Sequence, residues 1–536
     1  MAEQKGQNYL HGAAILTLGV VIMKILGFLY KMPIANIIGP DGYSMFMQTY
    51  NVYNVFLTLS TAGLPIALAR LISEARAEGR QMQARRTFHV AWWTFFCIGL
   101  VFSLVMLSFP DFIARRILHN PPAAMSIRTM APSVLLVCLV SAYRGYCQGF
   151  GNMIPTTVGQ VLEVLVKVVV GLALAWVVMH SARGKPMGSA AAIFGVTAGS
   201  LAALLYMWAY KRRHYRERAL ENPDIPDPDR KVFSRFMRIG IPIALGSSVL
   251  AILNLVDSGL TMGRLQSAAG FKLEAANVLN GVYGEAQTIF NLPAAVITPL
   301  TISVVPAISY AITRGEDDRA TKISEDSMRI AAILSMPMGV GLAVLAQPIM
   351  RVIYHDNHPA GPTLLAVMGI AAFFVCMVLM ENAILQASGK ELLPMITMIV
   401  GGVIKVTMNY FLVARPEINI YGAPVGTLVS YVVMAIMNFV FMCFVLDKNP
   451  KLRTILIRPF LCSAVMGGCA WGCYGLCERF LPLGHGRMHM LLCMVIAILL
   501  AVLVYFVMVL SLKMITKDDM SLIPGGAKLA RLLRMN

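Results

Sequence analysis

The segment QVLEVLVKVVVG, Gln160–Gly171, decides how the chain folds, and it lies within a longer apolar run at Ile154–Met179. A run of about twenty apolar residues can cross the hydrocarbon core of a bilayer as a helix. Glu163 and Lys167 nevertheless stand near its middle, where an ionisable residue costs about 2.5–3.5 kcal/mol on insertion scales. The segment therefore predicts a membrane-spanning helix whose charges need an explanation.

Apolar runs of this kind recur along all 536 residues of the chain. Hydrophobic residues make up 57% of it and charged residues only 13%, whereas soluble domains carry roughly 25% charge. We predict an all-α polytopic membrane protein with about fourteen transmembrane helices and no sizeable soluble domain. The run at 278–309 contains three prolines and is expected to be kinked or broken. The first run, at 12–31, is expected to be a retained span, because no cleavable signal pattern precedes it.

Lysine and arginine gather in alternate loops. The loops on the side of the two termini, together with the termini, hold about 29 of these residues, and the opposite side holds about 12. The positive-inside rule then places both termini in the cytoplasm. The net charge of +18 therefore reflects topology, and we expect no nucleic-acid partner. The ten cysteines lie nearly all in apolar runs, so we expect buried thiols and neither disulfides nor a metal site.

Two stretches of the chain repeat each other. The second stretch, Gln386–Lys405, starts 238 residues after the first, Gln148–Lys167. Each begins with Gln, has Gly at its fourth position and ends on Lys. Pro65 has its counterpart in Pro306, which follows it by 241 residues, nearly the same offset. This indicates two six-helix repeats around a central cavity, with substrate bound between them, plus two C-terminal helices. The predicted parts are an N-terminal lobe (1–212), a cytoplasmic linker (213–238), a C-terminal lobe (239–447), and two extra helices with a cytoplasmic tail (448–536).

Ionisable residues within the spans are the candidate functional residues. Glu163 and Lys167 share one helix face, either as a self-neutralising pair or as part of a watery cavity. Lys405 takes the place of Lys167 in the second repeat, where Gly401 replaces the glutamate, so local pairing does not explain it. Lys24 lies about halfway along the first run, so its side chain cannot easily extend its ammonium group to the membrane interface. We expect the three lysines to line a cavity for an anion such as phosphate or pyrophosphate.

Further polar residues complete the predicted site. Asp257 is expected to bind a proton or Na⁺, to pair with a cavity lysine, or to make structural hydrogen bonds. Glu163 and Glu285 are the further candidates for ion coupling or charge pairing. Arg264 is either a cavity residue or an interface residue at the outer end of its span. Asn51 and Asn54 are expected to face the sugar or peptide of a substrate.

Arg144, in SAYRGYCQG, has small neighbours. It is expected either to bridge packed helices through a carboxylate or to contact the substrate. Motifs of catalysis are missing from the chain: it contains no GxxxxGK[ST], HExxH or GxSxG sequence. We therefore expect no ATPase or other enzyme, no metal and no cofactor. Na⁺, H⁺ or the membrane potential is the expected energy source.

The N-terminal region resembles a known family. ILTLGVVIMKILGFLYKMPIANIIG (15–39) and TLSTAGLPIALARLISE (58–74) are similar to the start of stage V sporulation protein B-like oligosaccharide flippases. These belong to the multidrug/oligosaccharidyl-lipid/polysaccharide (MOP) exporter superfamily, which includes the MurJ-type lipid II flippases. YRGYCQGFGNMIPTTVGQVLEVLVK (143–167) and NAILQASGKELLPMITMIVGGVIK (382–405) resemble the family's fifth- and eleventh-span regions. The likeness covers nearly the whole chain.

The resemblance implies two six-helix lobes around a central cavity, with two C-terminal helices that form a lipid-tail groove in MurJ-type members. It implies that an undecaprenyl-pyrophosphate-linked precursor, lipid II or a related lipid-linked oligosaccharide, moves by alternating access across the bacterial cytoplasmic membrane. Lys24 takes the place of the cationic first-span residue of MurJ-type proteins. A second-span arginine of some MurJ proteins has no counterpart, and Tyr53 and Asn54 occupy that region. Membrane lipids and cell-wall synthesis proteins are the expected partners.

Two other functions stay open. One is a cation-coupled multidrug exporter of the same superfamily, whose cavity should be acidic or aromatic in order to hold organic cations. The deep charges of this chain are mostly lysines, which disfavours that function. The other is a non-transporting scaffold for envelope synthesis or spore formation, which would tolerate the loss of cavity charge.

Overall fold

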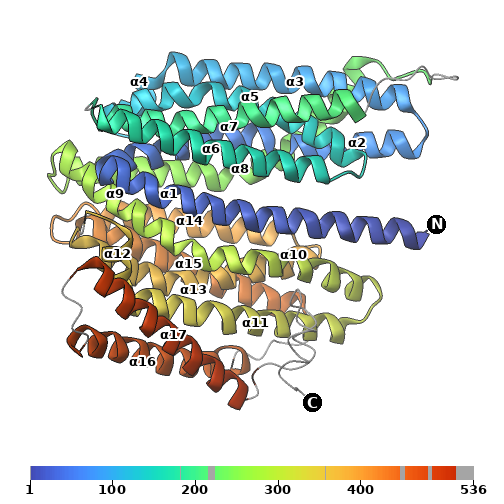
Figure 1. Cartoon of the computed structure of the whole chain (residues 1–536). Coiled ribbons are helices and arrows are strands. Elements are labelled where there is room, and N and C mark those ends of the chain that lie inside the picture. The colour runs from blue at the N-terminus through green and yellow to red at the C-terminus, as the bar shows by residue number, and fades with distance from the viewer. Residues whose placement is uncertain are drawn as a thin grey trace. The chain divides into compact units, whose positions relative to one another are not determined.

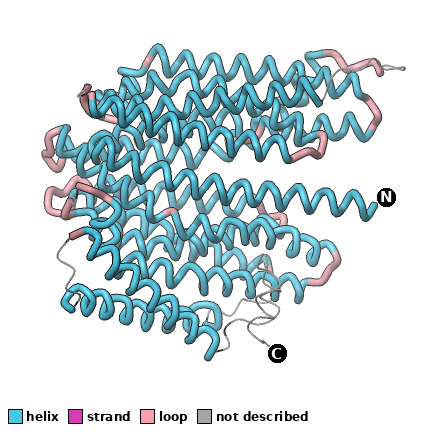
Figure 2. Tube along the Cα trace, in the orientation of Figure 1, coloured by secondary structure: helices cyan, strands magenta, loops and turns pink. Residues whose placement is uncertain are grey.

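The computed structural model describes residues 2–181, 183–214, 224–356, 358–446, 453–480, 486–512 and 514, with the backbone alone for 2–21, 24, 25, 453, 454 and 480. The described residues form helices and loops and contain no strand (Figure 2). The helices are α1 (Ala2–Thr61), α2 (Leu64–Ala77), α3 (Gln81–Ser108), α4 (Pro110–Phe112), α5 (Ala124–Gly149), α6 (Ile154–His180), α7 (Lys185–His214), α8 (Asp229–Ser267), α9 (Leu273–Phe290), α10 (Leu292–Thr313), α11 (Asp317–Val344), α12 (Ala346–Ile353), α13 (Ala360–Ala387), α14 (Leu392–Leu412), α15 (Gly422–Val445), α16 (Arg458–Phe480) and α17 (Arg487–Ser511). Short 3₁₀ or π turns lie at Ile113–Ile117, Pro121–Ala123, Asn419–Tyr421 and Arg453–Ile457.

Among the described residues, thirteen helical stretches are long and apolar enough to cross a membrane. The first, Leu26–Ala77, has 52 residues, which at about 1.5 Å per residue is more than twice the thickness of a bilayer core. It contains the predicted span 43–68 and the end of the predicted span 12–31, and it is interrupted at Gly39, whose φ of 72° and ψ of 169° are not helical. This combination is open essentially only to glycine. The predicted all-α polytopic fold is confirmed.

The stretch Leu273–Thr313 is interrupted, as its prolines predict. Helix α9 ends at Phe290, and α10 begins at Leu292 with Pro293 in its first turn. A proline there loses no hydrogen bond, because the first backbone N–H groups of a helix have no partner within it. The single predicted span therefore consists of two helices in sequence.

The structure repeats itself in the way the sequence predicts. Helices α3, α6 and α7 begin 236 to 238 residues before α11, α14 and α15. In the first set α6 packs on α7, α7 on α5 and α5 on α3 (Figure 1), and in the second α14 packs on α15, α15 on α13 and α13 on α11. Gly151 and Gly389, at the fourth position of the repeated stretch, both have positive φ, 76° and 73°. Such a glycine typically ends the preceding helix.

The chain divides into two compact units, which we call the first unit (1–267 with 271–281) and the second unit (268–270 with 282–536). Helix α8, the predicted first helix of the C-terminal lobe, packs on α1, α2 and α3 and belongs to the first unit. A glycine permits this contact, because a Cβ at Gly63 would collide with the backbone of Gly240 and Ala244. The unit boundary thus differs from the predicted lobe boundary, and the two lobes stay a prediction.

Helix α8 begins at Asp229, within the residues predicted as a cytoplasmic linker (213–238), and directly follows Pro228. A proline at the start of a helix is common. Within the described part of this linker, the carboxylate of Asp224 accepts hydrogen bonds from the backbone N–H groups of Met82 (2.6 Å) and Gln83 (3.0 Å). A carboxylate in this position satisfies donors at the start of α3 and fastens the linker to it.

A side chain at Gly199 of α7 is predicted to force α6 and α7 apart. Its Cβ would collide with the backbone carbonyl oxygen of Glu163, which cannot move aside as a flexible side chain can. We expect Gly199→Ala to destabilise the protein by about 1–3 kcal/mol, as overpacking usually does, and to lower the Tm in detergent. Gly468→Ala in α16 is the control, because no atom outside its own helix backbone lies within 4 Å of the added Cβ. Equal Tm values for the two variants would contradict a tight contact at Gly199.

Candidate functional site

An ion pair joins α5 to α6 within the first unit. Nη2 of Arg144 lies 2.6 Å from Oε2 of Glu163, and the two side chains are 15% and 20% exposed. The hydroxyl of Ser200, on α7, lies 3.5 Å from the other carboxylate oxygen. Glu163 thus forms its ion pair across helices with Arg144, while Lys167, one turn further along its own helix, interacts with it electrostatically at longer range. The sequence left two interpretations of Arg144 open. The structure agrees with the first, in which Arg144 bridges packed helices through a carboxylate.

Lys167 extends instead toward α1. Its Nζ lies 5.6 Å from the centroid of the Tyr30 ring, a distance typical of cation–π contacts. Tyr30 is buried, and its hydroxyl donates a hydrogen bond of 2.8 Å to the carbonyl of Ala192 on α7. The next residue, Lys31, lies near enough to Lys167 for the two ammonium groups to repel each other. Both lysines are half-buried, and neither forms an ion pair with a described residue.

Aromatic side chains continue along α1 from Tyr30. Its ring centroid lies 6.0 Å from that of Phe46, and Phe46 lies 4.9 Å from Tyr50. Tyr50 meets Tyr53 edge-on at 6.1 Å. Glu163 is close enough to both of these tyrosines to interact with them electrostatically. We call this arrangement of Lys31, Lys167, Tyr30, Tyr50 and Tyr53 the lysine–tyrosine face.

Of the residues of the lysine–tyrosine face, the sequence predicts only Lys167 as a site residue. Lys31 follows Lys24 by seven residues, which places the two on the same side of a helix, and this spacing could have identified it. Lys24 lies in α1, but its side chain is outside the described residues. Asn51 is half-buried and Asn54 is exposed, both on α1. The structure brings Lys167 next to Tyr30 and Lys31 of α1, and a cavity shared with Lys24 stays a prediction.

Helix α8 carries two further predicted residues of the first unit. Asp257 is buried, with 5% of its surface exposed, and Arg264 is half-buried. Both have interactions with other residues of the structure. Gln266 holds the C-terminal end of α8, because its side-chain amide donates a 2.8 Å hydrogen bond to the carbonyl of His119.

Buried amides tie α1 to α9. Nδ2 of Asn120 donates to Oε1 of Gln48 and to Oδ1 of Asn277, both at 2.7 Å, and Asn277 returns a bond of 3.2 Å. Asn280 donates to the hydroxyl of Ser44 at 2.8 Å. All five side chains are buried. A satisfied polar network in a low dielectric favours one arrangement of the helices over others. We call these residues the amide cluster.

The second unit holds Lys405 and Glu285. Lys405 is half-buried on α14 and interacts electrostatically with Tyr431 of α15, so a lysine–tyrosine neighbourhood recurs there. Glu285 is buried and borders a cavity of about 300 Å³, which Arg351 and His358 also line. Because each unit is described by itself, the convergence of Lys24, Lys167 and Lys405 in one cavity stays a prediction.

The ion pair of the first unit has no equivalent in the second. At the repeat offset of 238, Asn382, Gly401 and Asn438 take the places of Arg144, Glu163 and Ser200. Nδ2 of Asn438 donates to Oδ1 of Asn382 at 2.9 Å, and Thr397 donates to Oδ1 of Asn438 at 2.8 Å. Glu381, next to Asn382, is buried, and its Oε2 has no hydrogen-bond partner among the described residues.

Removing one partner of the Arg144–Glu163 pair is expected to destabilise the protein more than removing both. Arg144→Gln leaves a partly buried carboxylate without its counter-charge, so we expect a loss of about 1–3 kcal/mol, below the range for fully buried pairs because both groups retain some solvent. The double variant, Arg144→Gln with Glu163→Gln, leaves two neutral amides, so we expect it to lose less stability than the single variant. Thermal unfolding of the single and double variants forms a double-mutant cycle. Additive losses would argue against coupling between the two side chains.

The sequence matches two family models, one described as polysaccharide biosynthesis protein over residues 9–312 and one described as MatE over residues 278–411. Stage V sporulation protein B of Bacillus subtilis (strain 168) is 25% identical, with 97% of this chain and 98% of that protein covered. The lipid II flippase MurJ of the same strain is 24% identical, with 91% and 92% covered.

Solved structures share the fold. A lipid II flippase MurJ in an inward closed conformation superposes with a TM-score of 0.70 at 14% identity, covering 92% of this chain and 98% of that one. An inward-facing MATE family multidrug transporter of the MOP superfamily superposes with a TM-score of 0.65 at 15% identity, covering 80% and 97%. With its family match over more than half of its length, its membrane-spanning helices and its internal repeat, the chain belongs to the polysaccharide biosynthesis protein family of the MOP superfamily.

Proposed function

We propose that this protein is a flippase for a lipid-linked cell-wall precursor. Its substrate would be an undecaprenyl-pyrophosphate-linked sugar, lipid II or a related oligosaccharide, which it moves from the inner to the outer leaflet by alternating access. The observation that carries the proposal is the pair of Lys31 and Lys167, two neighbouring ammonium groups inside membrane spans without an ion-pair partner among the described residues. Glu163 offsets part of the charge of Lys167, and a negatively charged ligand would offset the rest.

A pyrophosphate suits this pair, because its charged oxygens can accept hydrogen bonds from both ammonium groups at once. Tyr50, which is half-buried beside the buried Tyr30 and Tyr53, offers an apolar ring for a sugar face together with a hydroxyl group for a hydrogen bond. Asn51 and Asn54, on the same helix, are the proposed contacts for the sugar or peptide. Lys24, Lys405 and Arg264 are proposed as further cationic residues of the substrate cavity.

The comparisons support this substrate class. The relative named as a lipid II flippase aligns with this chain over more than nine tenths of both proteins, and stage V sporulation protein B does so as well. Transport by a membrane carrier also accords with a chain in which no catalytic motif was found, and no enzymatic activity is proposed. Cell-wall synthesis proteins are the proposed partners.

The empty carrier needs a driving force for its return. We propose Na⁺ or H⁺ coupling, or the membrane potential, which contributes about 2.3 kcal/mol per charge and 100 mV. Asp257 and Glu285 are the proposed ion-binding residues, joined by Glu381, whose buried carboxyl has an oxygen without a partner among the described residues. Glu163 is the weaker candidate, because Arg144 already neutralises it. The lysine and arginine distribution favours a multi-pass protein with both termini in the cytoplasm.

A cation-coupled multidrug exporter is the second candidate function. The MatE match over residues 278–411 favours it, as does the buried carboxyl of Glu381, since coupled exporters need a group that gains and loses a cation. Its cavity would have to attract organic cations, and the lysine–tyrosine face would repel them.

Neutralising the two lysines is predicted to abolish flipping. In a strain depleted of the protein, we expect undecaprenyl-linked precursors to accumulate in the inner leaflet, as measured with a probe that reaches only the outer face. Wild type should reverse this accumulation, and Lys31→Gln or Lys167→Gln should each lower the rate about tenfold or more, as expected for a lost charged contact. Lys167→Arg should retain much of the activity. Lys272→Gln is the control, because Lys272 is an exposed lysine away from this face.

Three other outcomes are informative. Full activity of both glutamine variants at normal expression would disprove the assignment of the anion site. Normal lipid distribution with altered sensitivity to cationic drugs would favour the exporter and direct attention to Glu381. Normal lipid distribution with unchanged drug sensitivity, together with a cross-linked envelope protein, would favour the scaffold.

A further inference from the structure

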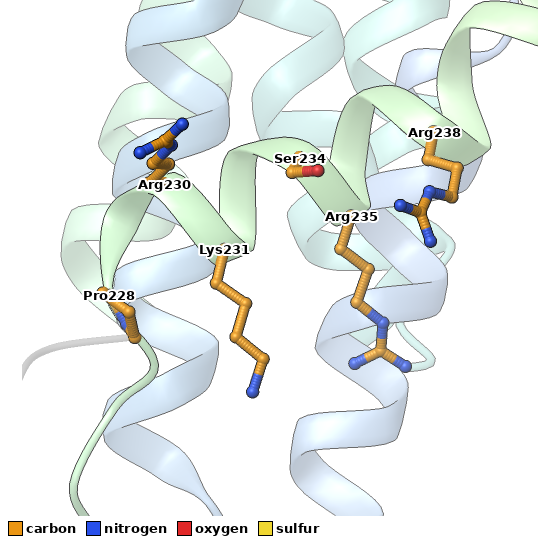
Figure 3. Close-up of a pocket in the computed structure, with 6 residues that line it drawn as sticks. All are labelled: Pro228, Arg230, Lys231, Ser234, Arg235 and Arg238. Atoms are coloured by element: carbon orange, nitrogen blue, oxygen red, sulfur yellow. The ribbon is translucent and has the colours of Figure 1, made fainter.

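A basic pocket at the start of α8 lies apart from the lysine–tyrosine face and is not used by the proposed function. It encloses about 510 Å³ and is lined by Pro228, Arg230, Lys231, Ser234, Arg235 and Arg238. Figure 3 shows the side chains of Lys231, Arg235 and Arg238 extending on the same side of the helix. All six residues belong to the first unit.

Only part of this positive charge is neutralised within the chain. Lys231 pairs with Asp227 at 3.1 Å and Arg235 with Glu74 at 2.7 Å, and both basic side chains stay more than half exposed, at 67% and 58%. Arg230 and Arg238 are exposed and form no ion pair with any residue that the structure describes. The first turn of α8 adds the partial positive charge of a helix N-terminus. The pocket is therefore suited to an anion.

An apolar stripe continues from the pocket along the same face of α8. It consists of four exposed side chains, Ile241 (43%), Leu245 (57%), Ile252 (43%) and Val256 (44%). They follow Arg238 by three, seven, fourteen and eighteen residues, spacings that keep all of them near one side of a helix. A cationic pocket followed by an exposed apolar stripe matches a ligand with a charged head and a hydrocarbon tail.

We propose that this pocket binds the anionic head group of a membrane phospholipid, with an acyl chain along the apolar stripe. Arginine suits this ligand, because its planar guanidinium donates two parallel hydrogen bonds to a phosphate. Free phosphate would neutralise the basic side chains but would leave the apolar stripe uncovered. The stripe therefore favours a lipid over free phosphate as the ligand. The positive-inside rule predicts that the pocket lies at the cytoplasmic surface, where anionic lipids attract basic segments. The proposal does not depend on the identity of the transported molecule.

The site can be tested with the purified full-length protein in detergent. Phosphatidylglycerol and phosphatidylcholine of equal chain length are added, and bound lipids are counted by native mass spectrometry. We expect phosphatidylglycerol to bind at least tenfold more tightly than phosphatidylcholine. Arg230→Gln with Arg238→Gln should remove this preference, at roughly fivefold in affinity for each charge, whereas lysine at both positions should retain most of it. Leu245→Asn should weaken the binding of long-chain phosphatidylglycerol more than the binding of a short-chain analogue.

A matched control distinguishes a built site from general charge attraction. Arg213→Gln with Lys390→Gln also removes two exposed basic residues from the side predicted to be cytoplasmic, but neither lines the pocket. An equal loss of binding in this control would overturn the proposal, as would equal affinity for the two lipids. Complete displacement of phosphatidylglycerol by excess inorganic phosphate, with no effect of Leu245→Asn, would overturn it in favour of a free-anion site. The Leu245→Asn variant also tests the site if the double arginine variant does not fold.

Discussion

The ion pair between Arg144 and Glu163 determines the electrostatics of the first unit. A charge inside a membrane span is tolerated when a partner neutralises it, and here the partner of Glu163 comes from a neighbouring helix. Arg144 forms the ion pair with this carboxylate, while Lys167 contacts Tyr30, lies close to Lys31 and interacts with Glu163 only at longer range. Because Glu163 is neutralised by Arg144, the group of Arg144, Glu163, Lys167 and Lys31 keeps a net positive charge, which suits the proposed anionic ligand.

The second repeat preserves the helices but not this charge pair. The positions of Arg144 and Glu163 are taken by Asn382 and Gly401, so that both partners are absent together. Loss of one partner alone would leave an uncompensated charge among the helices, whereas replacement of both does not. The lysine is retained as Lys405. The two units therefore keep one cationic position in common while differing in how their buried polar groups are satisfied.

Local patterns in the sequence predicted much of the fold and less of the site. The prolines predicted the break between α9 and α10, and the repeated glycines, Gly151 and Gly389, have the same positive φ in both repeats. By contrast, the spacing of Glu163 and Lys167 was compatible with a pair along one helix. Only the close contact of α6 with α7, which Gly199 permits, brings Ser200 beside Glu163. Asn120 of the amide cluster lies in a loop, where sequence periodicity carries no information.

Helix α9 has a mechanical consequence for the molecule. Its first half, Leu273–Gly281, belongs to the first unit and is held to α1 by the amide cluster, while the residues from Val282 onward belong to the second unit. The first half of α9 therefore cannot slide along α1 without breaking hydrogen bonds between buried groups, and this holds the two helices of the first unit in one register.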